Sequence, residues 1–214
     1  MRRILPLAGL FMAGPTFSLG LAIMQPQISA NAEMEGTGSF MISLAAEPAT
    51  WANSHIVLLV AAILYILAGL GVRDALAQSR PLTSQLLGLV IIAGAAMLIG
   101  NFALDFVYLA LATGLPPEAA QAVRHALLND GLLLPLFANI GPALFLLGMF
   151  FTALIAVITN WIPRITALPI IAGWAIIMGL HGVFPYAEAL GHFVVGTGFW
   201  VIGLAYLKSA RDNS

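Results

Sequence analysis

Long apolar runs alternate with short polar segments along the whole chain. An α-helix needs about 20 apolar residues to span the hydrocarbon core of a bilayer. Six runs reach that length: Ile4–Met24, Ala52–Val72, Gln85–Ala112, Leu132–Ile158, Ile165–Phe184 and Ala187–Leu207. The bilayer core offers no water to unpaired backbone groups, so each run is expected to be helical. The pattern predicts an all-α transmembrane bundle of six helices in a single domain, residues 1–214.

Composition supports a protein whose surface faces lipid. The chain is 61% hydrophobic and 8% charged, whereas a typical soluble domain is about 45–50% apolar and about 25% charged. The net charge of -1 comes without the clustered Lys and Arg that a nucleic-acid-binding face needs. The absence of cysteine excludes disulfides, thiolate metal sites and cysteine catalysis. The expected partner is therefore the lipid bilayer and not nucleic acid.

The basic residues predict how the helices are oriented, because cytoplasmic loops carry an excess of Lys and Arg. Only Arg124 falls on the opposite side of a six-helix serpentine from the other seven, which are Arg2, Arg3, Arg73, Arg80, Arg164, Lys208 and Arg211. Both termini are therefore expected inside the cell, with the protein in the inner (plasma) membrane as a multi-pass chain.

The first run also permits a different interpretation. Arg2 and Arg3 precede an apolar stretch, and Ala30-Asn31-Ala32 resembles a signal-peptide cleavage site. The apolar stretch is longer than the roughly 7–15 residues usual in signal peptides. A retained helix is therefore favoured over a cleaved signal peptide.

The segments expected outside the cell contain one short apolar stretch and one short helix. Residues 40–44 are apolar but too few to span, which favours a position at the membrane interface. Pro117 and Glu118 are typical of a helix start, and Asn129-Asp130-Gly131 is typical of a turn. The sequence therefore predicts a short amphipathic outer helix between the third and fourth spans.

Polar side chains at membrane depth gather in the expected outer half of the bundle. Asn101 and Asp105 are four residues apart on one helical face, and Glu188 and His192 have the same spacing. Placing Asp in mid-membrane costs about 2.5–3.5 kcal/mol. No Lys or Arg lies in the predicted spans to pair with Asp105, so this carboxyl needs a histidine, Arg124, a bound cation or a proton of its own.

These residues form the candidate site, an outward-opening cavity. Its expected metal or cofactor ligands are Asp105, His181, Glu188 and His192, and Asn101 and Asn139 complete its polar lining. Imidazole and carboxylate ligands suit a divalent metal, and two facing imidazoles suit haem b. Without either group, the same side chains would relay protons or bind a quinone or lipid head group. The hypothesis requires the third and sixth spans to be close, which the sequence does not determine.

The remaining histidines, His55 and His125, are expected to be surface residues. Two other functions stay open. The polar groups would serve packing in an accessory subunit of a membrane complex or in a homo-oligomer, or a metal-bound water would make the protein an intramembrane hydrolase. A microbial rhodopsin is excluded, because Lys208, at the end of the last span, is the only lysine. Whether the protein is an enzyme remains open.

The stretch Asn160-Trp161-Ile162-Pro163-Arg164-Ile165 resembles the inner loop of an uncharacterised bacterial family of six-helix integral membrane proteins. In that family an Ile-Pro-Arg turn joins the fourth and fifth helices. The inner N-terminus, the long first outer loop and the six spans are similar too. The resemblance implies the same membrane topology and no particular activity.

Overall fold

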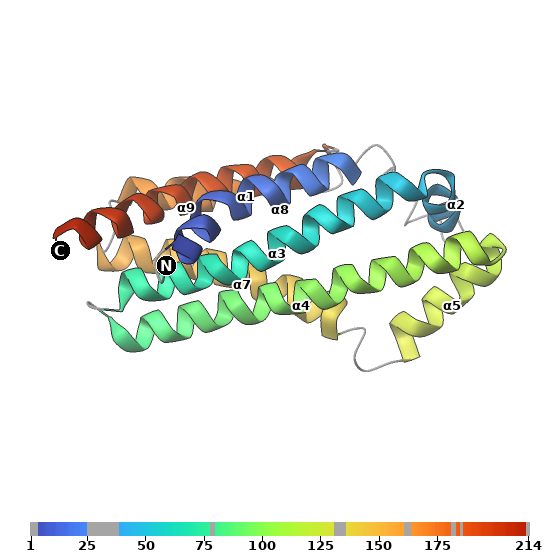
Figure 1. The fold of residues 1–214 in the computed structure, drawn as a ribbon, viewed down its shortest axis with the longest axis horizontal. Coiled ribbons are helices and arrows are strands. Elements are labelled where there is room, and N and C mark those ends of the chain that lie inside the picture. The colour runs from blue at the N-terminus through green and yellow to red at the C-terminus, as the bar shows by residue number, and fades with distance from the viewer. Residues whose placement is uncertain are drawn as a thin grey trace.

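The chain folds into α-helices, which confirms the predicted all-α class. The computed structural model describes residues 4–24, 39–77, 80–130, 136–160, 164–180, 183–184 and 186–212. Within them there are eight α-helices and no β-strand: α1 (Ile4–Met24), α2 (Ser39–Ala46), α3 (Pro48–Leu76), α4 (Pro81–Gly114), α5 (Pro117–Asp130), α7 (Gly141–Thr159), α8 (Ala167–Leu180) and α9 (Ala187–Asp212). A π-helix (Leu136–Ile140) precedes α7, and a 3₁₀ turn (Arg164–Thr166) precedes α8 (Figure 1).

Four of the helices are long and apolar enough to cross a membrane, namely α1, α3, α4 and residues Ala187–Lys208 of α9. Two shorter apolar helices, Gly141–Ile155 and Ala167–Leu180, correspond to the fourth and fifth predicted spans. The α-helix of the fourth predicted span is shorter than expected, because residues Leu136–Ile140 of that span form a π-helix. The α-helix begins directly after it, at Gly141 and Pro142. The four long helices support a membrane protein.

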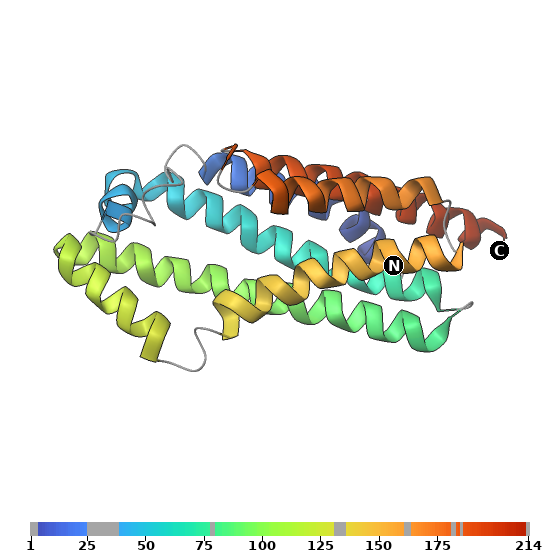
Figure 2. The same ribbon diagram turned by 180° about the vertical axis from the view of Figure 1, so that it is seen from behind.

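The long helices run side by side and close into a circle around the core. Going round, α4 packs against α3, α3 against α1, α1 against α9, α9 against α8, α8 against α7, and α7 against α4 (Figures 1 and 2). The third and sixth predicted spans, α4 and α9, therefore stand on different sides of this circle. The adjacency that the sequence-based site required is wrong, because α3 and α1 lie between these helices on one side and α7 and α8 on the other.

The two ends of the bundle differ. One end of the bundle, which we call the terminal end, holds the start of α1, the end of α9, the end of α3 and the start of α4 (Figure 1). At the opposite or distal end, α3 and α4 extend beyond α1 and α9, and α2 and α5 pack against them. Pro48, Pro81 and Pro117 each begin a helix, a position where the missing proline N–H removes no helical hydrogen bond.

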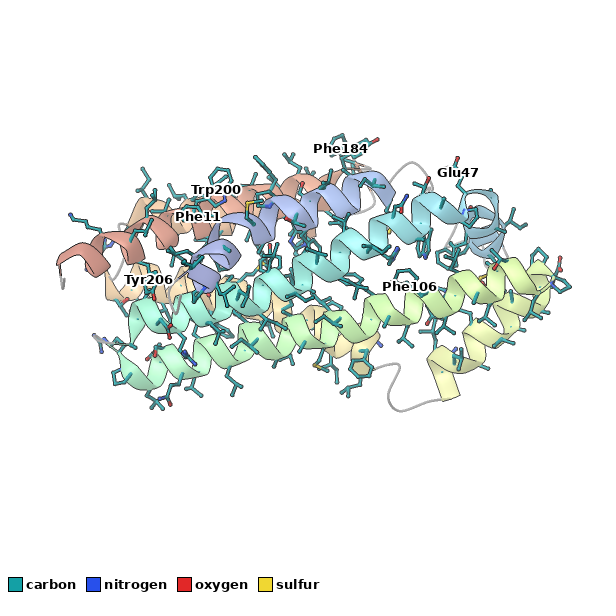
Figure 3. All side chains as sticks on the ribbon, viewed as in Figure 1. Phe11, Glu47, Phe106, Phe184, Trp200 and Tyr206 are labelled. Atoms are coloured by element: carbon teal, nitrogen blue, oxygen red, sulfur yellow. The ribbon has the colours of Figure 1, made fainter. Side chains whose placement is uncertain are left out.

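Two glycines and one proline shape the contact between α1 and α9. A Cβ atom at Gly14 would overlap the backbone of Gly196, so both glycines are needed for this close approach. Pro15 lies inside α1 and has no N–H to donate to the carbonyl of Phe11. The indole Nε1–H of Trp200 donates to that carbonyl instead, and Figure 3 shows the two side chains on adjacent helices. The proline in α1 thus leads to a hydrogen bond between helices.

The middle of the bundle is filled with aromatic side chains. Phe17 of α1 lies 5.8 Å from Tyr65, 5.9 Å from Phe102 and 5.9 Å from Phe145, measured between ring centroids. His192 of α9 lies 4.2 Å from Phe17. We call this group the central aromatic cluster: Phe17, Tyr65, Phe102, Phe145, His192 and Phe199.

The distal end has an apolar cluster of its own, made of Phe40, Met41, Leu44, Trp51, Tyr108, Ala112 and Ala120. It joins α2 and α5 to the projecting parts of α3 and α4. The helix predicted between the third and fourth spans is α5, and its Ala120 is fully buried while Val123 is exposed. The short segment at residues 40–44 lies in α2.

Candidate functional site

The most distinctive polar contact in the structure joins His55 of α3 to Asp105 of α4. The imidazole Nε2 lies 3.1 Å from the carboxyl Oδ2, and the two side chains are 2% and 18% exposed. The prediction that His55 is a surface residue is therefore wrong. Trp51, one turn earlier on α3, packs its indole over the imidazole, with ring centroids 4.2 Å apart. Burying His55 under an aromatic ring is what allows it to meet Asp105 away from bulk water.

The other imidazole nitrogen fixes the protonation pattern of the pair. His55 Nδ1 lies 2.8 Å from the carbonyl oxygen of Trp51. A carbonyl only accepts hydrogen bonds, so this bond forms in the tautomer that carries a proton on Nδ1. Ser54 Oγ also donates to that carbonyl, at 2.8 Å. With Nδ1 protonated, the contact between Nε2 and Oδ2 needs one further proton. That proton resides either on the imidazole, as an ion pair, or on the carboxyl, as a neutral pair.

The surroundings of the pair are mostly apolar. The imidazole lies 6.1 Å from the Phe102 ring and 6.2 Å from the Phe106 ring, edge-on in both cases. Phe106 stands between α3 and α4 in Figure 3. The indole Nε1–H of Trp51 donates to the backbone carbonyl of Asp105 at 3.3 Å. Because of this enclosure, contact with solvent occurs through the partly exposed carboxyl group.

One cation lies near the distal side of the pair. The Arg124 guanidinium carbon is 4.3 Å from the centroid of the Phe40 ring and 5.3 Å from that of Tyr108. Tyr108 is one helical turn beyond Asp105 on α4. The guanidinium of Arg124 thus lies against two aromatic faces, close to the helical face that carries Asp105.

The other predicted site residues lie in several places. Asn101 and Glu188 are half-buried, Asn139 is exposed on the π-helix, and His181 lies outside the described residues. His192 is 6% exposed and belongs to the central aromatic cluster. The ring contacts leading from His55 to His192 pass through Phe102 and Phe17. The structure therefore brings Asp105 to His55, which had not been chosen, and separates it from Glu188 and His192.

The metal and haem hypotheses find no ligand set in the described part of the chain. Across those residues, no group of three or more His, Cys, Asp or Glu side chains is positioned to hold a metal ion. The intervening Phe102 and Phe17 rings also keep His55 and His192 from facing each other, as two haem ligands would.

Ser54, His55 and Asp105 match the residue types of a hydrolytic triad, but not its geometry. Ser54 Oγ lies 3.1 Å from His55 Nδ1, yet the serine is fully buried and its hydroxyl donates to the carbonyl of Trp51. A nucleophilic serine must reach its substrate and must give its proton to the histidine. The arrangement does not fit nucleophilic hydrolysis.

Comparison with known proteins adds no relative: no protein-family model, curated protein or solved structure matches this chain.

Proposed function

We propose that this chain is a multi-pass protein of the inner (plasma) membrane and that its His55–Asp105 pair binds and passes on protons near the outer face. In this arrangement α1, α3, α4, α7, α8 and α9 are the six spans and both termini are cytoplasmic. The terminal end then carries Arg73, Arg80 and Arg164, as the preference for inner basic residues requires. The continuous helical segment from Leu136 to Thr159 would be about 36 Å long at 1.5 Å per residue, enough to span.

The position of the pair along its helices suits exchange with outer water. At 1.5 Å per residue, Asp105 lies about 14 Å from the distal end of α4. The whole of α4 is about 51 Å long, well beyond the roughly 30 Å of the hydrocarbon core. The distal end therefore extends into the head-group region. The carboxyl group, at 18% exposure, connects the buried imidazole with that region.

One observation carries the proposal: His55 Nδ1 is committed to a carbonyl, so the contact between Nε2 and the Asp105 carboxyl holds one proton between two titratable groups. Such a proton moves between the two groups without any side-chain rearrangement. Ionisable residues inside a membrane are costly and are typical of proton relays. Histidine is the side chain whose charge changes most readily near neutral pH.

Asp105→Asn is the decisive variant, because the asparagine amide still donates to His55 Nε2 but has no carboxyl proton to release. In vesicles that enclose a pH-sensitive dye, a potassium gradient with valinomycin would drive protons through the wild-type protein. We expect the flux to fall at least tenfold toward that of empty vesicles in Asp105→Asn. Asn101→Asp restores no flux in that background, because its carboxyl stands one turn away from His55. Equal flux through wild type and Asp105→Asn would contradict the proposal.

Infrared difference spectra provide a test that requires no transport. A pH step should change the carbonyl stretch of a protonated carboxyl group in the wild type, and this band should be missing in Asp105→Asn. A band that persists in the variant would assign the signal to another acid.

A structural role, as an accessory subunit or in a homo-oligomer, is the second candidate. It is favoured by the two bonds that tie α3 to α4 at this point, the His55–Asp105 pair and the hydrogen bond from Trp51 Nε1 to the Asp105 carbonyl. In that case Asp105→Asn would keep fold and activity, whereas Asp105→Leu would lose both. A partner or a second copy should then be recovered when the purified protein is crosslinked in membranes.

A further inference from the structure

Two polar atoms in the central aromatic cluster have no hydrogen-bond partner in the described part of the chain: Tyr65 Oη and His192 Nδ1. Tyr65 is completely buried and His192 is 6% exposed. Tyr65 belongs to α3 and His192 to α9, so the atoms come from helices on two sides of the core.

Both residues share the same two neighbours. Phe17 lies 5.8 Å from Tyr65 and 4.2 Å from His192. Phe145 lies 4.6 Å from Tyr65 and 6.0 Å from His192. The two polar side chains therefore lie in one small group of rings from α1, α3, α7 and α9. The apolar rings of Phe17 and Phe145 are next to both of them.

The energetics argue that these atoms have a partner of another kind. A buried donor or acceptor without a hydrogen bond costs about 1–3 kcal/mol, and here two of them occur together. Buried water satisfies such groups in proteins and typically makes about three hydrogen bonds. A tyrosine hydroxyl both donates and accepts, and a neutral imidazole nitrogen does one or the other, so a water molecule complements both. A charged ligand does not fit, because the cluster offers no opposite charge.

We propose that internal water binds between Tyr65 Oη and His192 Nδ1 and forms a second polar station, on the inward side of the His55–Asp105 pair. Phe102 separates the two stations, since its ring lies 6.1 Å from His55 and 5.9 Å from Phe17. The role of this station in proton passage rests on the proposed function, whereas the binding of water does not.

A double-mutant cycle tests the shared water. Tyr65→Phe removes only the hydroxyl, and His192→Leu removes the imidazole while keeping an apolar side chain. Unfolding of the full-length protein is followed in detergent micelles with increasing dodecyl sulfate. We expect Tyr65→Phe to raise the unfolding equilibrium constant about fivefold in the wild-type background and to have no effect beside His192→Leu, because the lost bonds belong to one network.

The matched control is a cycle between Tyr65→Phe and Phe199→Leu. The ring centroid of Phe199 lies 6.1 Å from that of Tyr65, but the Phe199 side chain has no polar atom. Coupling through water should therefore be absent in this second cycle. If Tyr65→Phe leaves stability unchanged or raises it, the hydroxyl is truly unsatisfied and the proposal is overturned. Equal coupling in the two cycles would also overturn it, because packing alone would then explain both.

Nuclear magnetic resonance of ¹⁵N-histidine-labelled protein gives a direct second measurement. A magnetisation transfer peak from water to the His192 ring is expected in the wild type and should vanish in Tyr65→Phe. No peak in the wild type would overturn the proposal. If Asp105→Asn loses proton flux but the wild type shows no water peak at His192, the proposed function stands and the water site is overturned. If the water peak is present but Asp105→Asn keeps its flux, the water site stands and the proposed function is overturned.

Discussion

The surroundings of His55 and His192 differ more than their burial does. Each imidazole is at least nine-tenths buried, and each lies with its ring centroid 4.2 Å from that of one aromatic side chain, Trp51 or Phe17. His55 has a carbonyl on one nitrogen and a carboxyl on the other. His192 Nδ1 has no partner among the described residues. The two histidines therefore differ in their hydrogen-bond partners and not in their burial.

The difference between these regions follows from what packs there. The distal end brings together α2, α3, α4 and α5, and the His55–Asp105 pair lies between α3 and α4. The central region is built where the long helices approach one another through glycine, as at Gly14 and Gly196. The rings of Phe17, Tyr65, Phe145 and His192 fill this region. The proposed shared proton therefore belongs to the distal region, and the proposed internal water belongs to the central aromatic cluster.

His55→Leu should have the largest effect on the distal region, because it leaves the Asp105 carboxyl without its partner. Removing one partner of a buried ion pair costs about 3–5 kcal/mol. The proton shared in this pair and the partial exposure of Asp105 place the expected loss near the lower limit. Dodecyl sulfate unfolding would measure it. His125→Leu is the control, since His125 is exposed. Equal losses in both variants would mean that the pair adds no stability.

Gly14→Ala should be the next largest change and should affect the central region. Its new Cβ atom would overlap the backbone of Gly196, which cannot rotate away as a side chain does. Overpacking of this kind costs about 1–3 kcal/mol. Gly179→Ala is the matched control, because nothing lies within 4 Å of a Cβ atom there. A stability of Gly14→Ala equal to that of the control would refute the tight crossing of α1 and α9.

Trp200→Phe should cost about 1 kcal/mol, the usual net value of one hydrogen bond, because it removes the donor to the Phe11 carbonyl. Pro15→Ala supplies a backbone N–H to that same carbonyl. The effect of Trp200→Phe should therefore be smaller in the Pro15→Ala background. Additive losses in the double variant, measured by the same unfolding assay, would show that the indole bond does not depend on the proline.

Asp105→Asn should have the smallest effect on stability, below about 0.5 kcal/mol, since the asparagine amide can replace the missing proton with its own N–H. The same variant is expected to abolish the carboxyl infrared band. Together these results would show that the hydrogen bond to His55 maintains stability, whereas the titrating proton belongs to the Asp105 carboxyl. A loss as large as that of His55→Leu would indicate that the charge itself stabilises the fold.

The sequence by itself determined the helical class and the approximate positions of the long helices. Long apolar runs require helices in lipid, and Pro117 marks a helix start. The helices α3 and α4 begin at Pro48 and Pro81, four residues before the predicted starts at Ala52 and Gln85. The sequence also singled out Asp105 as a carboxyl in need of a partner. It did not find His55, although His55 and Asp105 lie at comparable distances along the chain from the turn between α3 and α4. In an antiparallel helix pair, that spacing places residues at similar height.

Only the tertiary structure decided which helices are neighbours, and therefore that Asp105 meets His55 and not Glu188 or His192. The physical reason is that side chains facing lipid and side chains facing the core are equally apolar, so hydropathy does not reveal which face of a helix turns inward. Helix neighbours are instead selected by shape. In this protein that selection depends on where glycine permits close contact, as at Gly14 against Gly196 and at Gly94 against Phe145.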